Sequence, residues 1–120
     1  MRYAVLMYAD PERTTAMTAD ELDEVARKHA ALRDELIPAG VVVGGAGLVL
    51  PEETTTLRWN GPTSAGPFLA GRDQLTAYYE IECATEDQAR EIAARVLDFH
   101  VVAVELRRIH DRVDLGAGGS

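Results

Sequence analysis

The sequence is poor in positive charge, in cysteine and in long apolar runs, and each shortage excludes a class of protein. Twelve Lys and Arg stand against 20 Asp and Glu, a net charge of −8, so no nucleic-acid partner is expected. The one cysteine, Cys83, rules out an internal disulfide and favours a reducing compartment, hence a cytoplasmic protein. No stretch approaches the roughly 20 apolar residues of a membrane span, so no membrane partner is expected either.

Histidine is also scarce, and its spacing predicts neither a metal nor a cofactor. The three histidines form no H-x-x-x-H pattern, and there is no CxxC pair. The run Gly44-Gly45-Ala46-Gly47 fits neither a dinucleotide fingerprint nor a P-loop. It favours a bulged strand that lines a pocket over a phosphate loop. On the same pattern reading, Cys83 is expected to be a buried core thiol rather than a nucleophile.

The best-defined stretch is a helix between Thr18 and Gly40. Thr18 and Glu21 form a capping box at its start, and Pro38 and Gly40 end it. One apolar stripe is predicted along it at a spacing of three and four residues: Leu22, Val25, Ala26, His29, Leu32 and Leu36. His29 stands in the middle of this stripe, and Arg33 follows one turn later. The pattern therefore predicts a titratable ring turned inward with a guanidinium beside it.

The remaining periodicities predict an α+β fold. The expected elements are a central strand over 2–8, a short polar loop after Asp10, and strands over 41–43, 48–50, 54–59, 74–83 and 101–109. The strand over 54–59 is expected near the sheet edge and is followed by a hairpin turn at Asn60-Gly61, a loop over 62–71 and a second helix from Thr85 to about His100. This order, β-α-β-(β)-β-α-β, is the split βαβ, ferredoxin-like plan with two helices on one face of an antiparallel sheet. We expect one domain over residues 1–112 and a flexible tail over 113–120.

The first strand also predicts a partner. Residues 3–8 are apolar on both faces of the strand, whereas two helices cover only one face of the sheet. A second copy of the chain is the simplest cover for the other face. We therefore expect a homodimer that associates through the open sheet face.

At this point the chain resembles the YCII-related proteins, the YciI-like and DGPF-domain group. The segment LIPAGVVVGGAGL is similar to their LxxAGVxxGGxGL, and the opening MRYAVLMYAD resembles their first strand. Ala65-Gly66-Pro67-Phe68, followed by Gln74, Leu75 and Tyr78, resembles the DGPF stretch and its strand. The sequence departs from that pattern where Ala65 replaces the Asp of DGPF, where Ala70 replaces a Glu, and where Arg72 replaces a Lys.

The resemblance implies a dimeric α+β barrel and an active-site pair. In the YciI-like branch an Asp after the first strand and a His in the first helix form a proposed dyad, and these positions match Asp10 and His29. Some relatives are lyase-like. A carboxylate bound to an imidazole suits acid–base work near neutral pH, and Arg33 can hold an anionic oxygen. The other candidate ligand-binding residues are Gly45, Gly47, Pro67, Phe68 and Tyr78.

Two classes of function follow from the same cavity. One is a cofactor-independent acid–base enzyme, lyase- or isomerase-like, for a small oxygenated or aromatic metabolite. The other is a non-catalytic ligand-binding or regulatory dimer, with a haem-handling barrel as a distant third. The structural alternatives are a hydrogen-bonded core histidine at His29, a turn cap at Asp10 and a solvated or ion-paired surface group at Arg33.

Overall fold

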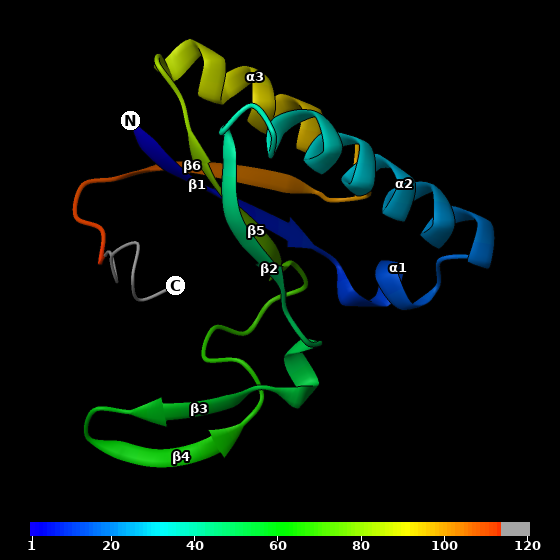
Figure 1. Cartoon of the computed structure of the whole chain (residues 1–120). Coiled ribbons are helices and arrows are strands. Elements are labelled where there is room, and N and C mark those ends of the chain that lie inside the picture. Colours follow the sequence, from blue (N-terminus) through cyan, green and yellow to red (C-terminus); the bar gives the residue numbers. More distant parts are fainter. Residues whose placement is uncertain (114–120) are drawn as a thin grey trace.

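The computed structural model describes residues 1–113 as an antiparallel four-stranded sheet with two long helices on one face and a separate hairpin (Figure 1). The elements are β1 (Arg2–Ala9), α1 (Pro11–Thr15), α2 (Ala19–Leu36), β2 (Val42–Gly47), the 3-10 helix η1 (Pro51–Glu53), β3 (Thr55–Arg58), β4 (Gly61–Ala65), β5 (Gln74–Glu82), α3 (Glu86–Val96) and β6 (Ala103–Ile109). The strand order β2-β5-β1-β6 matches the split βαβ plan. Across these residues, no helix has both the length and the apolar character to cross a membrane.

The core lies between the sheet and the two long helices. Alternate residues of β1 are buried, from Tyr3 to Ala9, while the residues between them are only partly buried on the open face. Opposite them pack Leu32 and Leu36 of α2 together with the apolar stripe of α3. Cys83 is buried in this core, as predicted, and burial raises the pKa of its thiol. The core thus accounts for one face of the sheet and leaves the other face open.

Helix α2 begins as the sequence predicts, but only its second half packs on the sheet. The Glu21 amide donates to the Thr18 hydroxyl, and the Thr18 amide donates to the Glu21 carboxylate, which completes the capping box. The predicted stripe is wrong at its start, because Leu22 is exposed. Figure 1 shows the reason: the first turns of α2 extend past the edge of the sheet. His29 therefore lies where the helix first meets the sheet.

The glycine run belongs to strand β2 and does not interrupt it. β2 continues through Gly44 and Gly45 to Gly47 with a bulge between Val42 and Gly44, and the strand predicted over 48–50 is not formed. Gly45 has a φ of 158° and pairs with Tyr79 of β5. A Cβ at Gly45 would lie 2.6 Å from the Tyr78 carbonyl oxygen and 2.9 Å from Tyr79 Cδ1. Glycine is required here so that the two backbones can approach.

Three further boundaries differ from the prediction. The loop expected after Asp10 contains the short helix α1, which begins because the Glu12 amide donates to Asp10 Oδ1 at 3.0 Å and Pro11 starts the turn. Helix α3 ends at Val96 rather than near His100. The loop expected over 62–71 begins with strand β4. Apart from Val113, the tail predicted over 113–120 lies outside the described residues.

Strands β3 and β4 form a hairpin that projects from the end of the sheet, on the side away from α2 and α3 (Figure 1). The sequence predicts β3 near the edge of the main sheet, and this is wrong, because among residues 1–113 β3 pairs with β4 alone. We call residues 55–65 the arm. Thr56 is the single buried residue of the arm, and its hydroxyl donates to the Gly66 carbonyl oxygen at 2.7 Å. The arm thus has no hydrophobic core of its own.

Candidate functional site

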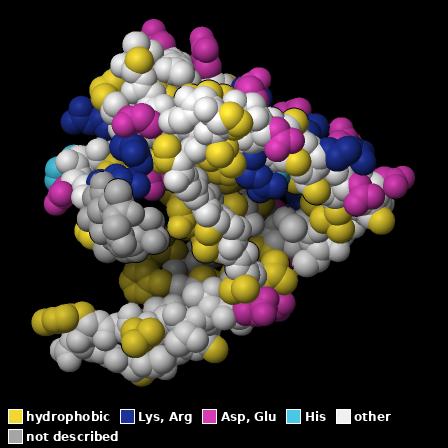
Figure 2. All heavy atoms as spheres, viewed as in Figure 1, with side chains coloured by type: hydrophobic (Ala, Val, Ile, Leu, Met, Phe, Trp, Pro, Cys, Tyr) yellow, Lys and Arg dark blue, Asp and Glu magenta, His cyan; other side chains and the backbone are white. Residues whose placement is uncertain are grey.

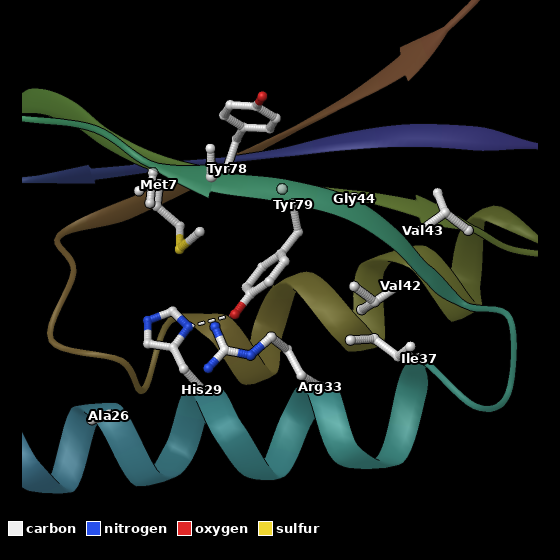
Figure 3. A pocket seen from close by; sticks show the side chains of 14 residues that line it. Met7, Ala26, His29, Arg33, Ile37, Val42, Val43, Gly44, Tyr78 and Tyr79 are labelled. Carbon is white, nitrogen blue, oxygen red and sulfur yellow. Dashed lines mark hydrogen bonds between the residues drawn. The ribbon is translucent and has the colours of Figure 1, made fainter. Parts of the chain in front are cut away.

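A pocket of about 610 Å³ opens between α2 and the strands β2 and β5 (Figure 3). Its size is within the range of small-molecule sites. Most of its wall is apolar or backbone, and three polar side chains meet in it: His29 and Arg33 from α2, and Tyr79 from β5. The apolar side chains of the wall are Met7, Ala26, Ile37, Val42, Val43, Ala46 and Ala77.

The imidazole of His29 is held by an aromatic hydroxyl. His29 Nδ1 lies 2.6 Å from the Tyr79 hydroxyl oxygen, a short, well-formed hydrogen bond. The ring of Phe99 packs edge-on against the imidazole, with ring centroids 4.6 Å apart and an interplanar angle of 63°. The other ring nitrogen of His29 has no hydrogen-bond partner within residues 1–113. The imidazole is thus fixed on one side and available on the other.

Both partners of this bond are neutral near pH 7. Burial first, and then the nearby Arg33 guanidinium, lower the pKa of His29 below its ordinary value of 6.5. Burial raises the pKa of Tyr79, although Arg33 acts in the opposite direction. In one tautomer Tyr79 donates to Nδ1 and Nε2 carries the proton. In the other, Nδ1 donates to Tyr79 and Nε2 keeps a lone pair. The pair can therefore present either a donor or an acceptor to a ligand.

Arg33 provides positive charge without a local counter-ion. Its guanidinium lies next to the Tyr79 hydroxyl in Figure 3. No Asp or Glu of the described chain forms an ion pair with it, although six other arginines are paired. A partly solvated guanidinium at the wall of an apolar pocket is suited to an anionic oxygen of a ligand. Of the alternatives for Arg33, the ion-paired surface group is therefore not observed.

The glycines of β2 form the opposite wall. Gly45 allows the Tyr79 ring to pass close to the strand and reach His29. A Cβ at Gly47 would meet nothing within 4 Å, so this residue leaves open space in the pocket. The wall is therefore mainly backbone, which leaves room for a ligand beside the polar side chains.

The structure does not pair Asp10 with His29. Asp10 is buried at the start of α1, where it accepts the Glu12 amide, and it lines a second pocket of about 620 Å³ with Arg72. The direct dyad expected from the sequence is therefore not formed within residues 1–113, because His29 bonds Tyr79 and Asp10 caps α1. A catalytic role for either residue remains a prediction.

The other predicted ligand-binding residues divide among three places. Gly45, Gly47 and Tyr78 line the first pocket, although Figure 3 shows the Tyr78 ring on the opposite side of the sheet from His29. Pro67 lines the second pocket. Phe68 lies beside the arm, with the Arg58 guanidinium 5.9 Å from its ring centre. Pro67 and Phe68, from the stretch that resembles DGPF, therefore do not line the pocket of His29.

Tyr79 is the functional candidate that sequence reasoning missed. Its orientation could be predicted from the pattern, because residues 77, 79 and 81 of β5 alternate onto the core face. His29 belongs to the stripe of α2 that packs on that same face. Alternation therefore predicts a contact between α2 and Tyr79 rather than Tyr78, but the hydrogen bond itself required the three-dimensional structure.

The sheet order, the two helices on one face and the pocket at the helix–strand seam define a ferredoxin-like α+β protein. Sequence comparison then gives the family: a model of the YCII-related domain matches residues 1–109, and the chain belongs to this family. An uncharacterised protein of Rhizobium meliloti (strain 1021) is 36% identical over 96 residues, which cover 78% of this chain and 77% of that protein. The predicted family is thus confirmed.

Proposed function

We propose that this protein is a cofactor-independent acid–base enzyme, lyase- or isomerase-like, that acts on a small oxygenated anion as a cytoplasmic homodimer. The observation that carries the proposal is the 2.6 Å contact between His29 and Tyr79 beside Arg33 in an apolar pocket. It replaces the His–Asp pair as the reactive centre, because Tyr79 now sets the orientation and tautomer of His29.

The proposed chemistry is proton abstraction beside a carbonyl group. With Nδ1–H donating to Tyr79, the lone pair of His29 Nε2 accepts a proton from the carbon next to the carbonyl. The electron pair of that C–H bond moves onto the carbonyl oxygen as an enolate, and Arg33 stabilises its charge. Return of the proton to another carbon gives isomerisation, and loss of a leaving group gives elimination. The lowered pKa of His29 keeps the base unprotonated at neutral pH.

The alternative is a binding protein without turnover. It is favoured by the apolar wall and by the tight packing of His29 between Tyr79 and Phe99, which hold the ring in place. In that case Arg33 and His29 recognise the anion and nothing is converted. The same pocket serves both functions, so the experiment must separate binding from reaction.

Binding is tested with pairs of small molecules. One member of each pair is a carboxylate or enolisable acid, and the other is its neutral ester or amide. Thermal unfolding is measured for the wild type, His29→Gln, Arg33→Gln and the control Arg27→Gln, an exposed arginine of the same helix. We expect the anions to raise the melting temperature of the wild type and of Arg27→Gln. Arg33→Gln should lose roughly tenfold or more in affinity for the anion but not for the ester. Equal shifts in all four proteins would show that the anions do not bind at His29 and Arg33.

Reaction is tested by incubating the binding compounds in D₂O and following proton NMR signals. Abstraction beside a carbonyl exchanges that C–H for deuterium, and we expect exchange with the wild type but not with His29→Gln. Exchange that survives in His29→Gln would contradict the assigned base. Binding without any exchange would favour the non-catalytic dimer.

A further inference from the structure

The arm carries large apolar side chains that nothing in the described chain covers. Trp59 at its tip is 99% exposed, and Leu57 is 77% exposed. An isolated two-stranded hairpin is at best marginally stable in water, and the arm buries only Thr56. Exposed apolar surface of this kind on a projecting element is typical of an intermolecular contact.

The arm and the sheet enclose a hollow on the side opposite the helices. Figure 2 shows the surface hollowed between the arm and the rest of the chain, with hydrophobic side chains along it. The radius of gyration is 15.9 Å, whereas a compact domain of this length has roughly 13.6 Å. The arm, which extends away from the body, contributes to this excess (Figure 1). The hollow is therefore space that residues 1–113 leave unfilled.

The open face of the sheet is suited to a second copy of itself. Near the root of the arm it presents the partly exposed side chains Leu75 and Tyr78. Towards the other end its charges pair with one another: Arg2 with Glu80 and Glu82, and Arg107 with Glu105. The face is thus close to neutral on a chain whose net charge is −8. Two copies can approach here without the repulsion that the rest of the surface would impose.

We propose that a second copy of this chain fills the hollow, and that the arm of each copy closes over the other with Trp59 as its anchor. The proposal rests on the homodimer of the proposed function. It adds the contact of each arm, residues 55–65, with the partner, which we call the clasp. It requires a two-fold arrangement in which both sheets meet and each arm contacts the partner. Aromatic residues such as tryptophan are the usual energetic anchors of protein interfaces.

The test uses the full chain and its only tryptophan. Sedimentation equilibrium gives the mass, and the emission maximum and acrylamide quenching of Trp59 report its burial. We expect twice the 13.1 kDa chain mass with a blue-shifted, protected Trp59. On dilution, mass and emission should change at the same protein concentration. Leu57→Ser should raise the dimer dissociation constant roughly tenfold or more, while Leu22→Ser, at an exposed leucine on α2, should not change it.

Each other outcome overturns a defined part of the proposal. A dimer with a red-shifted, freely quenched Trp59 would contradict the contact between each arm and the partner, but not the dimer itself. A monomer with a protected Trp59 would show that the arm closes on its own chain. A monomer with an exposed Trp59 would contradict both the dimer and the contact of the arm with a partner. The anion-binding assay is read separately: a His29→Gln chain that dimerises but no longer binds leaves the clasp intact, and a monomeric Leu57→Ser chain that still binds leaves the pocket function intact.

Discussion

Two pockets lined by the described residues have nearly the same volume, about 610 and 620 Å³, but very different polar groups. In the first, His29 keeps one ring nitrogen free and Arg33 has no counter-ion within the described residues. In the second, Asp10 already accepts a backbone amide and Arg72 pairs with Asp73 at 3.2 Å. The comparison teaches that the state of the polar groups, rather than volume, distinguishes a candidate site from a structural gap.

The largest expected effect tests the wall of the first pocket. Gly45→Ala places a Cβ against the Tyr78 carbonyl oxygen and the Tyr79 ring, so we expect a loss of about 1–3 kcal/mol in the free energy of unfolding. The anion response should fall as Tyr79 moves away from His29. Gly47→Ala is the matched control, because its Cβ meets nothing within 4 Å, and its stability should stay within roughly 0.5 kcal/mol. Urea denaturation measures both, and equal losses would contradict the close approach.

The second prediction tests the role of Asp10. Asp10→Ala removes the cap of α1, and we expect a loss of about 1 kcal/mol in unfolding free energy. Asp10→Asn keeps an accepting side-chain oxygen and should restore most of that stability. Neither variant should change anion binding at His29, because Asp10 lines the other pocket. If Asp10→Asn folds with wild-type stability but loses deuterium exchange, the pair expected from the sequence acts together after all, and the two pockets are not independent.

The fold and the candidate site could be predicted only in part from the sequence. The capping box of α2 and the two apolar faces of β1 followed from local pattern, because capping and periodicity depend on neighbours in the chain. The arrangement of the sheet followed from the order of the elements, which fits the split βαβ plan. His29 and Arg33 were found for the same reason, since they share one helix. Tyr79 was not found, because its hydrogen bond to His29 depends on a partner that is distant in the chain. At Asp10 the sequence left a turn cap and a catalytic partner of His29 open, because it does not show which group binds the carboxylate. The arm was misplaced because the pairing of short strands is decided by tertiary contacts.

The smallest expected effect is on the titration of His29. The pKa of His29 in the folded chain lies below 6.5. As the pH falls below about 6.5, His29 therefore becomes protonated in the unfolded chain before it does so in the folded chain. The contribution of His29 to stability is therefore complete at neutral pH and decreases towards acid. Arg33→Gln removes one of the two causes, so the pKa of His29 should rise slightly, since solvent screens an exposed guanidinium. NMR titration of the imidazole Cε1–H measures this, and an unchanged midpoint would mean that burial alone sets the pKa.

The glycine composition of β2 has a consequence for the evolution and redesign of this pocket. Three of the six residues of β2 are glycine, so this wall offers few side chains to exchange, and at Gly45 any addition disturbs Tyr79. The facing helix is the less constrained side, at positions such as Ala26 and Ile37, which line the pocket from α2 and from just after its end. Libraries aimed at new substrates should vary this helical side and keep Gly45 unchanged.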